Sequence, residues 1–226
     1  MLYIKRNLLC ILYLSAFLSI SKISFAASEG GFEAIVNIPL GTAVTVVHKN
    51  VPVEGNPKGH ANFQCGIETD IGYMFQLKEN MGISLLGVFG YNYTSASYSK
   101  YNGNIKYKFI ENDIYIGILP KFNIDSFSIG INFGFRFTLS PNILFYNSKD
   151  TVEIKQDIYP RMYIRGTFDY SIFFREDMAI NVGIYIGYDF GDYWDGTSKE
   201  LYVVKNESFG NVEVGAQFGF RFGPKF

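Results

Sequence analysis

The chain has 226 residues and a formal net charge of −1 at pH 7, and 18% of its residues are aromatic. This charge balance argues against a nucleic-acid partner and against a polybasic membrane patch, since both need an excess of Lys and Arg. Of the two cysteines, Cys10 lies in a segment that we predict to be removed. Cys65 would then be alone in the mature protein, and no intramolecular disulfide is expected.

The beginning of the chain has the features of a leader for export. Two basic residues precede an apolar run over residues 8–20, and the small residues Ser24 and Ala26 occupy the positions that a signal peptidase reads. We predict a signal peptide over residues 1–26 and one domain over residues 27–226, since all-β barrels of about 200 residues are commonly single domains.

Along the rest of the chain, apolar residues alternate with small or polar ones, which is typical of β-strands that have one apolar face. Alternation is strictest between Phe127 and Leu139, where large apolar residues occupy every odd position. An irregularity at Pro39, Leu40 and Gly41 indicates a bulge or the end of the first strand. We predict eight strands, within residues 32–40, 61–77, 81–93, 106–122, 127–139, 162–174, 178–190 and 212–222.

The connections between these strands are short and long in turn. Short turns are predicted near residues 78–80, 123–126 and 175–177, and long polar loops near residues 47–60, 94–105, 140–160 and 191–208. This pattern is typical of up-and-down transmembrane β-barrels, in which short turns face the periplasm and longer loops face the exterior. Both ends of the mature chain are therefore expected on the periplasmic side.

Alternation alone does not decide which face points inward, because a soluble lipocalin-like barrel also has eight alternating strands. Side-chain volume decides it, since about six large apolar side chains per strand exceed what the narrow interior of an eight-stranded barrel can hold. The apolar face is therefore expected to contact lipid, with a soluble barrel or sandwich as the alternative. Aromatic residues gather at both strand ends, as interfacial girdles do: Phe75, Phe122, Phe127, Phe174 and Phe222 near the turns, and Tyr91, Tyr93, Phe137, Tyr188 and Phe190 near the loops.

Charged residues on the polar faces are expected to point into the lumen. Opposite charges must pair there, because an unpaired buried charge costs several kcal/mol. The near balance of acids and bases favours a salt-bridge plug over the alternative, an acidic ring for cations or protons. The predicted lumen charge network contains Glu33, Glu68, Asp70, Asp113, Lys121, Arg136, Arg161, Arg165, Asp169, Asp189, Glu213 and Arg221.

Two ion pairs follow from the expected strand register. A tight turn between the fourth and fifth strands sets Asp113 directly opposite Arg136 on the inward face, within a slip of two residues. Glu33 and Arg221 lie near the periplasmic rim of the first and last strands, and they are expected to pair where the barrel closes.

The sequence gives little support for catalysis or for a bound cofactor. His48 and His60 both fall in the first long loop, and no Ser, His and acid set has a spacing typical of a catalytic triad. Asp189, Asp192 and Asp195 lack the spacing of an EF-hand, so turn-forming aspartates are favoured over a calcium site. We predict no cofactor and no catalytic or metal-binding residue.

The last predicted strand continues its apolar parity to the end of the chain, through Phe218, Phe220, Phe222 and Phe226. This pattern resembles the closing strand and assembly signal of bacterial outer-membrane β-barrels. With its leader and alternation, the mature chain resembles the small barrels of the OmpA transmembrane-domain, OmpX and OmpW kind. The resemblance implies an outer-membrane location, contact with outer-membrane lipid and recognition of the last strand by the barrel-assembly machinery.

Proteins of this architecture include anchors, adhesins, small-solute pores and a few enzymes. We expect a non-enzymatic barrel with a closed polar lumen and with surface loops for structural, adhesion or interaction roles, including contact with extracellular ligands. The alternatives are a narrow pore for small solutes or ions, and an outer-membrane lipid-modifying enzyme or protease. Aromatic residues among polar ones in the loops fit two interpretations equally, contact surfaces or a continuation of the strands above the membrane: Tyr98, Tyr101, Tyr146, Tyr193, Trp194 and Tyr202.

Overall fold

The structure is a computed structural model that describes residues 30–49, 58–100, 105–139, 142–147, 151–155, 160–190 and 207–225. The predicted signal peptide and the terminal Phe226 lie outside these ranges. The described residues form ten β-strands: β1 (Gly30–Lys49), β2 (Lys58–Lys78), β3 (Met81–Lys100), β4 (Ile105–Ile124), β5 (Phe127–Thr138), β6 (Asn142–Asn147), β7 (Thr151–Lys155), β8 (Arg161–Arg175), β9 (Met178–Asp189) and β10 (Glu207–Phe222).

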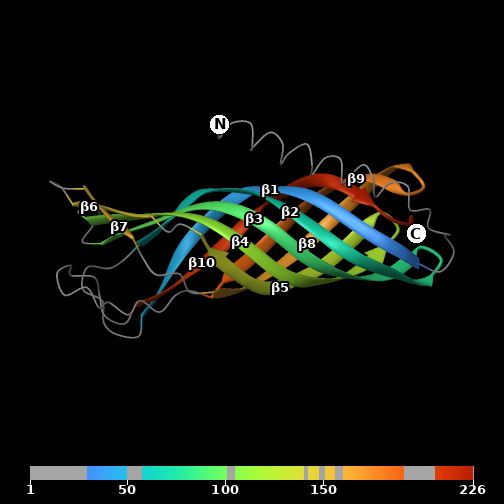
Figure 1. Cartoon of the computed structure of the whole chain (residues 1–226), viewed down its shortest axis with the longest axis horizontal. Helices are drawn as coiled ribbons and strands as arrows, with labels where there is room; N and C mark the ends of the chain where they lie inside the picture. The colour runs from blue at the N-terminus through green and yellow to red at the C-terminus, as the bar shows by residue number, and fades with distance from the viewer. Residues whose placement is uncertain are drawn as a thin grey trace, which may run out of the picture.

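Eight of these strands close into a barrel, in the order β1-β2-β3-β4-β5-β8-β9-β10, with β10 paired back to β1 (Figure 1). Every neighbouring pair is antiparallel and follows the chain order, so the predicted all-β, eight-stranded antiparallel up-and-down fold of the transmembrane type is confirmed. Among the described residues, no helix has the length and hydrophobicity to span a bilayer.

The short turns lie where the sequence predicts them, at residues 79–80, 125–126 and 176–177. Asn80 and Asp125 adopt positive φ angles of 65° and 49°. Asn and Asp tolerate this left-handed conformation better than most residues, because their short polar side chains can form local hydrogen bonds. These residues allow the chain to reverse within two positions.

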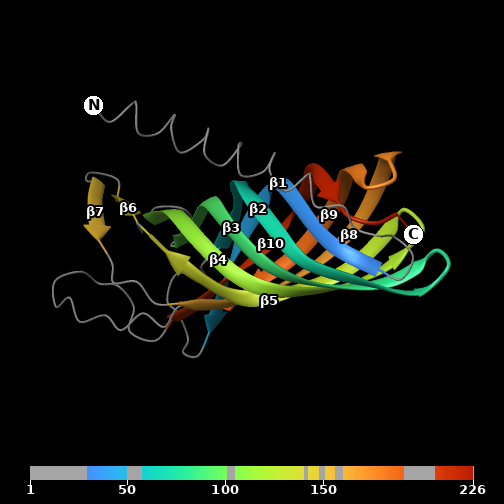
Figure 2. The same cartoon turned by 45° about the vertical axis from the view of Figure 1, so that its right-hand side comes forward.

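The loop predicted over residues 140–160 contains further structure. β6 pairs with the beginning of β4, at Ile105 to Ile110, and β7 pairs with β6, so the hairpin extends the sheet beyond the closed barrel (Figure 2). β3 and β4 likewise remain paired out to Lys100 and Ile105, inside the loop predicted over residues 94–105. The sequence pattern misses these parts because it identifies strands by a long alternating apolar face, and a backbone ladder does not require such a face.

The expected irregularity in the first strand is neither a bulge nor a strand end. β1 pairs with β10 without interruption, whereas its ladder with β2 omits Ile38 and Pro39 and resumes at Leu40 in unchanged register. Proline has no N–H to donate to a ladder, which accounts for the gap. The prediction at residues 39–41 is therefore wrong.

The register determines the tilt of the strands. A path of directly paired residues can be followed once around the barrel. It starts at Ile35 on β1, passes through each of the seven other barrel strands in turn, and returns to β1 at Thr45. A shift of ten residues over eight strands corresponds to a tilt of about 40° from the barrel axis. A barrel of this size has room for one layer of side chains from each wall and for little else.

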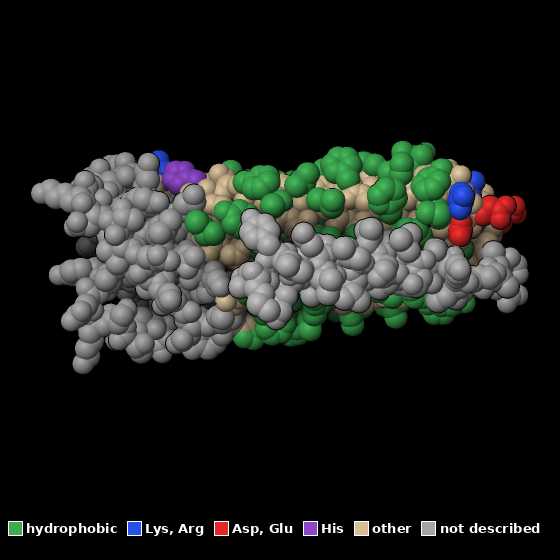
Figure 3. All heavy atoms as spheres, turned by 45° about the horizontal axis from the view of Figure 1, so that its top comes forward, with side chains coloured by type: hydrophobic (Ala, Val, Ile, Leu, Met, Phe, Trp, Pro, Cys, Tyr) green, Lys and Arg blue, Asp and Glu red, His purple; other side chains and the backbone are tan. Residues whose placement is uncertain are grey.

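The outer surface is apolar and exposed. Ile186, Phe63 and Ile131 have exposed fractions of 64%, 57% and 53%, which are unusual for large hydrophobic side chains in a folded protein. Figure 3 shows such side chains along the visible barrel wall, with most of the visible charges gathered at the end that carries the short turns. Aromatic contacts lie near both ends, with ring centroids 4.8 Å apart for Phe127 and Tyr170 and 5.1 Å apart for Tyr188 and Phe190.

The interior combines polar residues with a small apolar cluster. The cluster contains Ile35, Leu86, Val88, Tyr115, Leu119 and Tyr163, all of them nearly or fully buried. Its aliphatic members occupy inward-facing positions on β1, β3 and β4, where the sequence pattern suggests small or polar residues. An inward face that is purely small or polar, as the sequence pattern suggests, is therefore incomplete as a description of the lumen.

Candidate functional site

All twelve residues of the predicted lumen charge network are buried, with exposed fractions of at most 4%. They lie on all eight barrel strands except β3, at positions whose side chains point inward. Seven are acids and five are bases, so the lumen charge network carries a formal excess of two negative charges.

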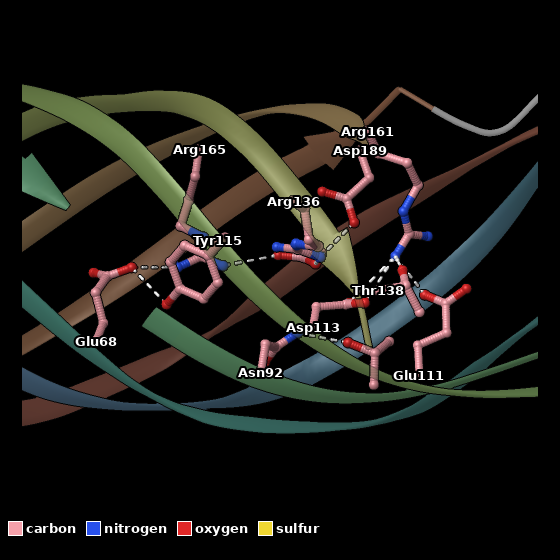
Figure 4. Close-up of polar contacts among 12 residues, drawn as sticks. Glu68, Asn92, Glu111, Asp113, Tyr115, Arg136, Thr138, Arg161, Arg165 and Asp189 are labelled. Atoms are coloured by element: carbon pink, nitrogen blue, oxygen red, sulfur yellow. Dashed lines mark hydrogen bonds and ion pairs between the residues drawn. The ribbon is translucent and has the colours of Figure 1, made fainter. Parts of the chain in front are cut away.

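The centre of the lumen holds a continuous chain of five charged side chains (Figure 4). Arg165 on β8 contacts Glu68 on β2 at 3.0 Å and Glu213 on β10 at 3.2 Å. Glu213 also accepts a hydrogen bond from Arg136 on β5 at 2.5 Å, and Arg136 donates to Asp189 on β9 at 2.5 Å. This chain crosses the lumen, because its members come from five strands spread around the barrel.

A second group lies at the end of the lumen that faces the long loops. Arg161 on β8 contacts Glu111 and Asp113 on β4 at 2.8 Å and 3.2 Å, and it donates a hydrogen bond to Thr138 at 3.0 Å (Figure 4). The sequence prediction omits Glu111, although its odd position on β4 marks it as inward-facing. Arg161 thus binds both acids of the Glu111 and Asp113 pair.

The expected bond between Asp113 and Arg136 is replaced by other partners. Asp113 lies opposite Thr138, and Arg136 lies opposite Tyr115, which is a slip of two residues from the predicted register. The slip arises because β4 continues to Ile124 and the chain reverses over residues 125–126 alone, so that Ile124 instead of Phe122 pairs with Phe127. Asp113 contacts Arg161 instead, and Arg136 contacts Asp189 and Glu213.

A third group lies toward the short turns. Lys121 contacts Asp169 at 2.7 Å, and Gln217 donates a hydrogen bond to the other carboxylate oxygen of Asp169 at 2.5 Å. Glu33 and Arg221 contact each other at 3.0 Å across the junction of β1 and β10, as the sequence predicts.

Three inward tyrosines hold the arginines of the central chain in place. The Arg136 guanidinium lies 5.6 Å from the ring centroid of Tyr115 and 5.5 Å from that of Tyr163. Arg165 lies 5.5 Å from the ring centroid of Tyr115 and 4.8 Å from that of Tyr185. Each arginine therefore lies within 6 Å of two aromatic ring centroids, a distance at which the rings stabilise a desolvated cation. The Tyr115 hydroxyl also donates to Glu68 at 2.8 Å.

Inward glycines make room for these rings. Gly90 is paired directly with Tyr115, and Gly215 is paired directly with Tyr185. A Cβ atom at Gly215 would lie 2.6 Å from the Tyr185 ring, and one at Gly90 would overlap the Tyr115 ring. Tyr163 and Tyr185 are absent from the predicted lumen residues, although their odd positions on β8 and β9 mark both as inward-facing.

The remaining candidate residues form no visible site. His60 is exposed, and its Nε2 atom lies 3.0 Å from the Ser99 hydroxyl. The Asp192 and Asp195 positions of the weighed calcium loop lie outside the described residues, as does the side chain of His48. Within the described ranges, no group of three or more His, Cys, Asp or Glu side chains could hold a metal ion.

No family model matches the chain. No curated protein matches it either. Among solved structures, it is similar to Neisserial surface protein A (NspA), with 11% identity, a TM-score of 0.41, and coverage of 88% of this chain and 100% of that one. Ail, the attachment invasion locus protein of Yersinia pestis, has 14% identity, a TM-score of 0.37, and coverage of 86% and 100%.

The outer membrane protease OmpT from Escherichia coli is also similar, with 11% identity, a TM-score of 0.45, and coverage of 89% of this chain and 99% of that one. The chain is thus similar to outer-membrane barrels, the group that its last strand resembles. At these identities and TM-scores, the likeness says nothing about the activity of this chain.

Proposed function

We propose that this protein is a non-enzymatic outer-membrane β-barrel with a closed lumen, whose long loops serve a structural, adhesion or interaction role at the cell exterior. The observation that carries the proposal is the burial of the lumen charge network, in which no side chain is more than 4% exposed. Bulk water does not reach these charges, and a conducting path needs water.

The ion pairs give a physical reason for closure. Arg165 and Arg136 link acids on β2, β9 and β10, so that their side chains lie across the lumen. Opening a path would separate ion pairs in a poorly solvated interior, where the loss of one partner costs several kcal/mol. Wide water-filled channels, by contrast, belong to barrels of sixteen or more strands.

The outer surface supports a location in a membrane. Large apolar side chains are exposed on all sides of the described barrel, and burial against lipid removes that area from water. On β10, Phe218 and Phe220 have exposed fractions of 49% and 52% and face outward. We propose that the outer-membrane lipid is one partner, and that the barrel-assembly machinery recognises β10 together with the terminal Phe226.

Conductance in a planar lipid bilayer tests the closed lumen. The purified, refolded wild type is expected to give no steady current. The Arg136→Gln variant is measured beside it, because this substitution breaks two central ion pairs without adding a charged group. The alternative to a closed lumen is a narrow cation-conducting pore, which the excess of two acids among the buried charges supports. Steady cation-selective currents from the wild type would establish that pore and end the closed-lumen proposal.

Cell fractionation tests the location and the assembly signal. The mature protein is expected in the outer-membrane fraction, and unboiled and boiled samples should migrate differently in SDS gels because a folded barrel resists SDS. Deletion of Phe226 should reduce the folded band, whereas replacement of the neighbouring exposed Lys225 by Gln should not. A mature protein that is freely soluble would contradict the proposal.

A further inference from the structure

One buried acid in the lumen has no partner of its own. Six of the seven acids in the lumen charge network form an ion pair with a buried base, and each of the five bases is paired. Asp70 is the exception within the described residues. Its side chain is 0% exposed, and neither of its carboxyl oxygens has a hydrogen-bond partner.

The surroundings of Asp70 do not favour a negative charge. Its direct neighbours across the sheet are Ile35 on β1 and Val88 on β3, both members of the apolar cluster. The charged groups that act on Asp70 are three acids and one base: Glu68, Asp169, Glu33 and Lys121. The base is already bound to Asp169 at 2.7 Å.

We propose that Asp70 is a proton-binding site, and that it holds a neutral carboxyl group inside the folded barrel. A buried carboxylate without a partner is costly, whereas the neutral acid is far cheaper to bury. A positive charge must therefore come from outside the chain, and a proton is the smallest one available.

A proton fits this position better than a metal cation does. Calcium and magnesium need six or more oxygen ligands, and the described residues contain no group of acids, His and Cys able to hold a metal ion. Ile35 and Val88, which flank Asp70 in the sheet, have side chains without ligand atoms. A proton needs one carboxyl oxygen alone.

The site makes the barrel sensitive to pH in one direction. While the proton is bound, the carboxyl is neutral and its burial is tolerated. As the pH rises, loss of the proton leaves an uncompensated negative charge beside Glu68, Asp169 and Glu33, so the folded barrel is destabilised. Lys121 moderates this charge but remains bound to Asp169.

Infrared spectroscopy of the refolded, full-length mature protein in detergent tests the site directly. At neutral pH the wild type should show the carbonyl stretch of a protonated carboxylic acid, and this band should disappear as the pH is raised. Asp70→Asn, which matches the shape of the neutral acid, should lack the band and retain the folded gel mobility. Asp113→Asn is the control, because Asp113 is bound to Arg161 and its loss should leave the band intact.

The wild-type measurement decides the proposal even if the Asp70→Asn variant does not fold. If the wild type shows no neutral-acid band, its unfolding is compared in sodium, potassium and a large organic cation. A dependence on the cation would mean that an alkali ion occupies the site, and no dependence would mean a hydrated carboxylate. Either result overturns the proton site, as would a band that persists in Asp70→Asn.

Discussion

Arg136 provides the sharpest test of how the lumen is held together. It is 1% exposed, contacts Asp189 and Glu213 at 2.5 Å each, and lies within 6 Å of the ring centroids of Tyr115 and Tyr163. Arg136→Met keeps much of the side-chain volume but removes the charge, so that Asp189 loses its base and Glu213 keeps Arg165 alone.

The expected loss follows from these contacts. Breaking a buried ion pair by removing one partner costs about 3–5 kcal/mol, because the remaining charge is left without compensation. Loss of the two aromatic contacts adds roughly 2 kcal/mol for a desolvated cation. We therefore expect Arg136→Met to lower the free energy of unfolding by about 5–7 kcal/mol.

The assay is urea unfolding in detergent micelles, followed by the far-UV circular dichroism of the β-sheet. Glu213→Gln and the double variant complete a thermodynamic cycle, in which the double variant should be more stable than the sum of the two losses predicts. A coupling of about 1–3 kcal/mol is expected for groups in direct contact. A loss below about 1 kcal/mol for Arg136→Met would refute the argument that the ion pairs close the lumen.

Three further predictions follow from the barrel wall. Gly90→Ala should lower the unfolding free energy by about 1–3 kcal/mol, because its Cβ overlaps the Tyr115 ring, whereas outward-facing Gly87→Ala, whose Cβ would meet an atom at 3.6 Å, should have little effect. Ile131→Arg should lower the free energy of unfolding in bilayer vesicles by about 2–4 kcal/mol, and Ile124→Arg near the turn should lower it by less. Equal losses for the two variants would contradict the contact of this surface with lipid. Glu33→Gln should reduce the fraction of SDS-resistant barrel, since Arg221 then lacks its anionic partner at the junction of β1 and β10.

The sequence predicts the barrel well because lipid imposes a pattern on it. Every barrel strand has to place apolar side chains on one face, so a period of two marks β5 from Phe127 to Thr138 almost without error. The pattern ends where that requirement ends. β6 and β7 lie beyond the closed ring, and their short runs of six and five residues do not resemble the long alternating barrel strands.

The lumen is predicted in composition but less well in its contacts. Parity identifies which charged residues point inward, and the Glu33 and Arg221 pair follows because both lie at the junction of adjacent strands. Pairs that cross the lumen depend on the tilt of the strands, which the sequence pattern does not provide. Arg136 therefore reaches Asp189 on β9, and a turn shorter than expected moves it away from the position opposite Asp113.

The crossing geometry of the ion pairs has a consequence for the order of folding. Glu68 on β2 contacts Arg165 on β8, and Glu213 on β10 contacts Arg136 on β5, so these pairs join strands far apart in the chain. A hairpin that formed alone would carry charges whose partners have not arrived, and inserting them into hydrocarbon would be costly. Folding should therefore be cooperative and slow, as is expected when contacts are distant in sequence. Insertion of the last strands would then coincide with the pairing of the lumen charges.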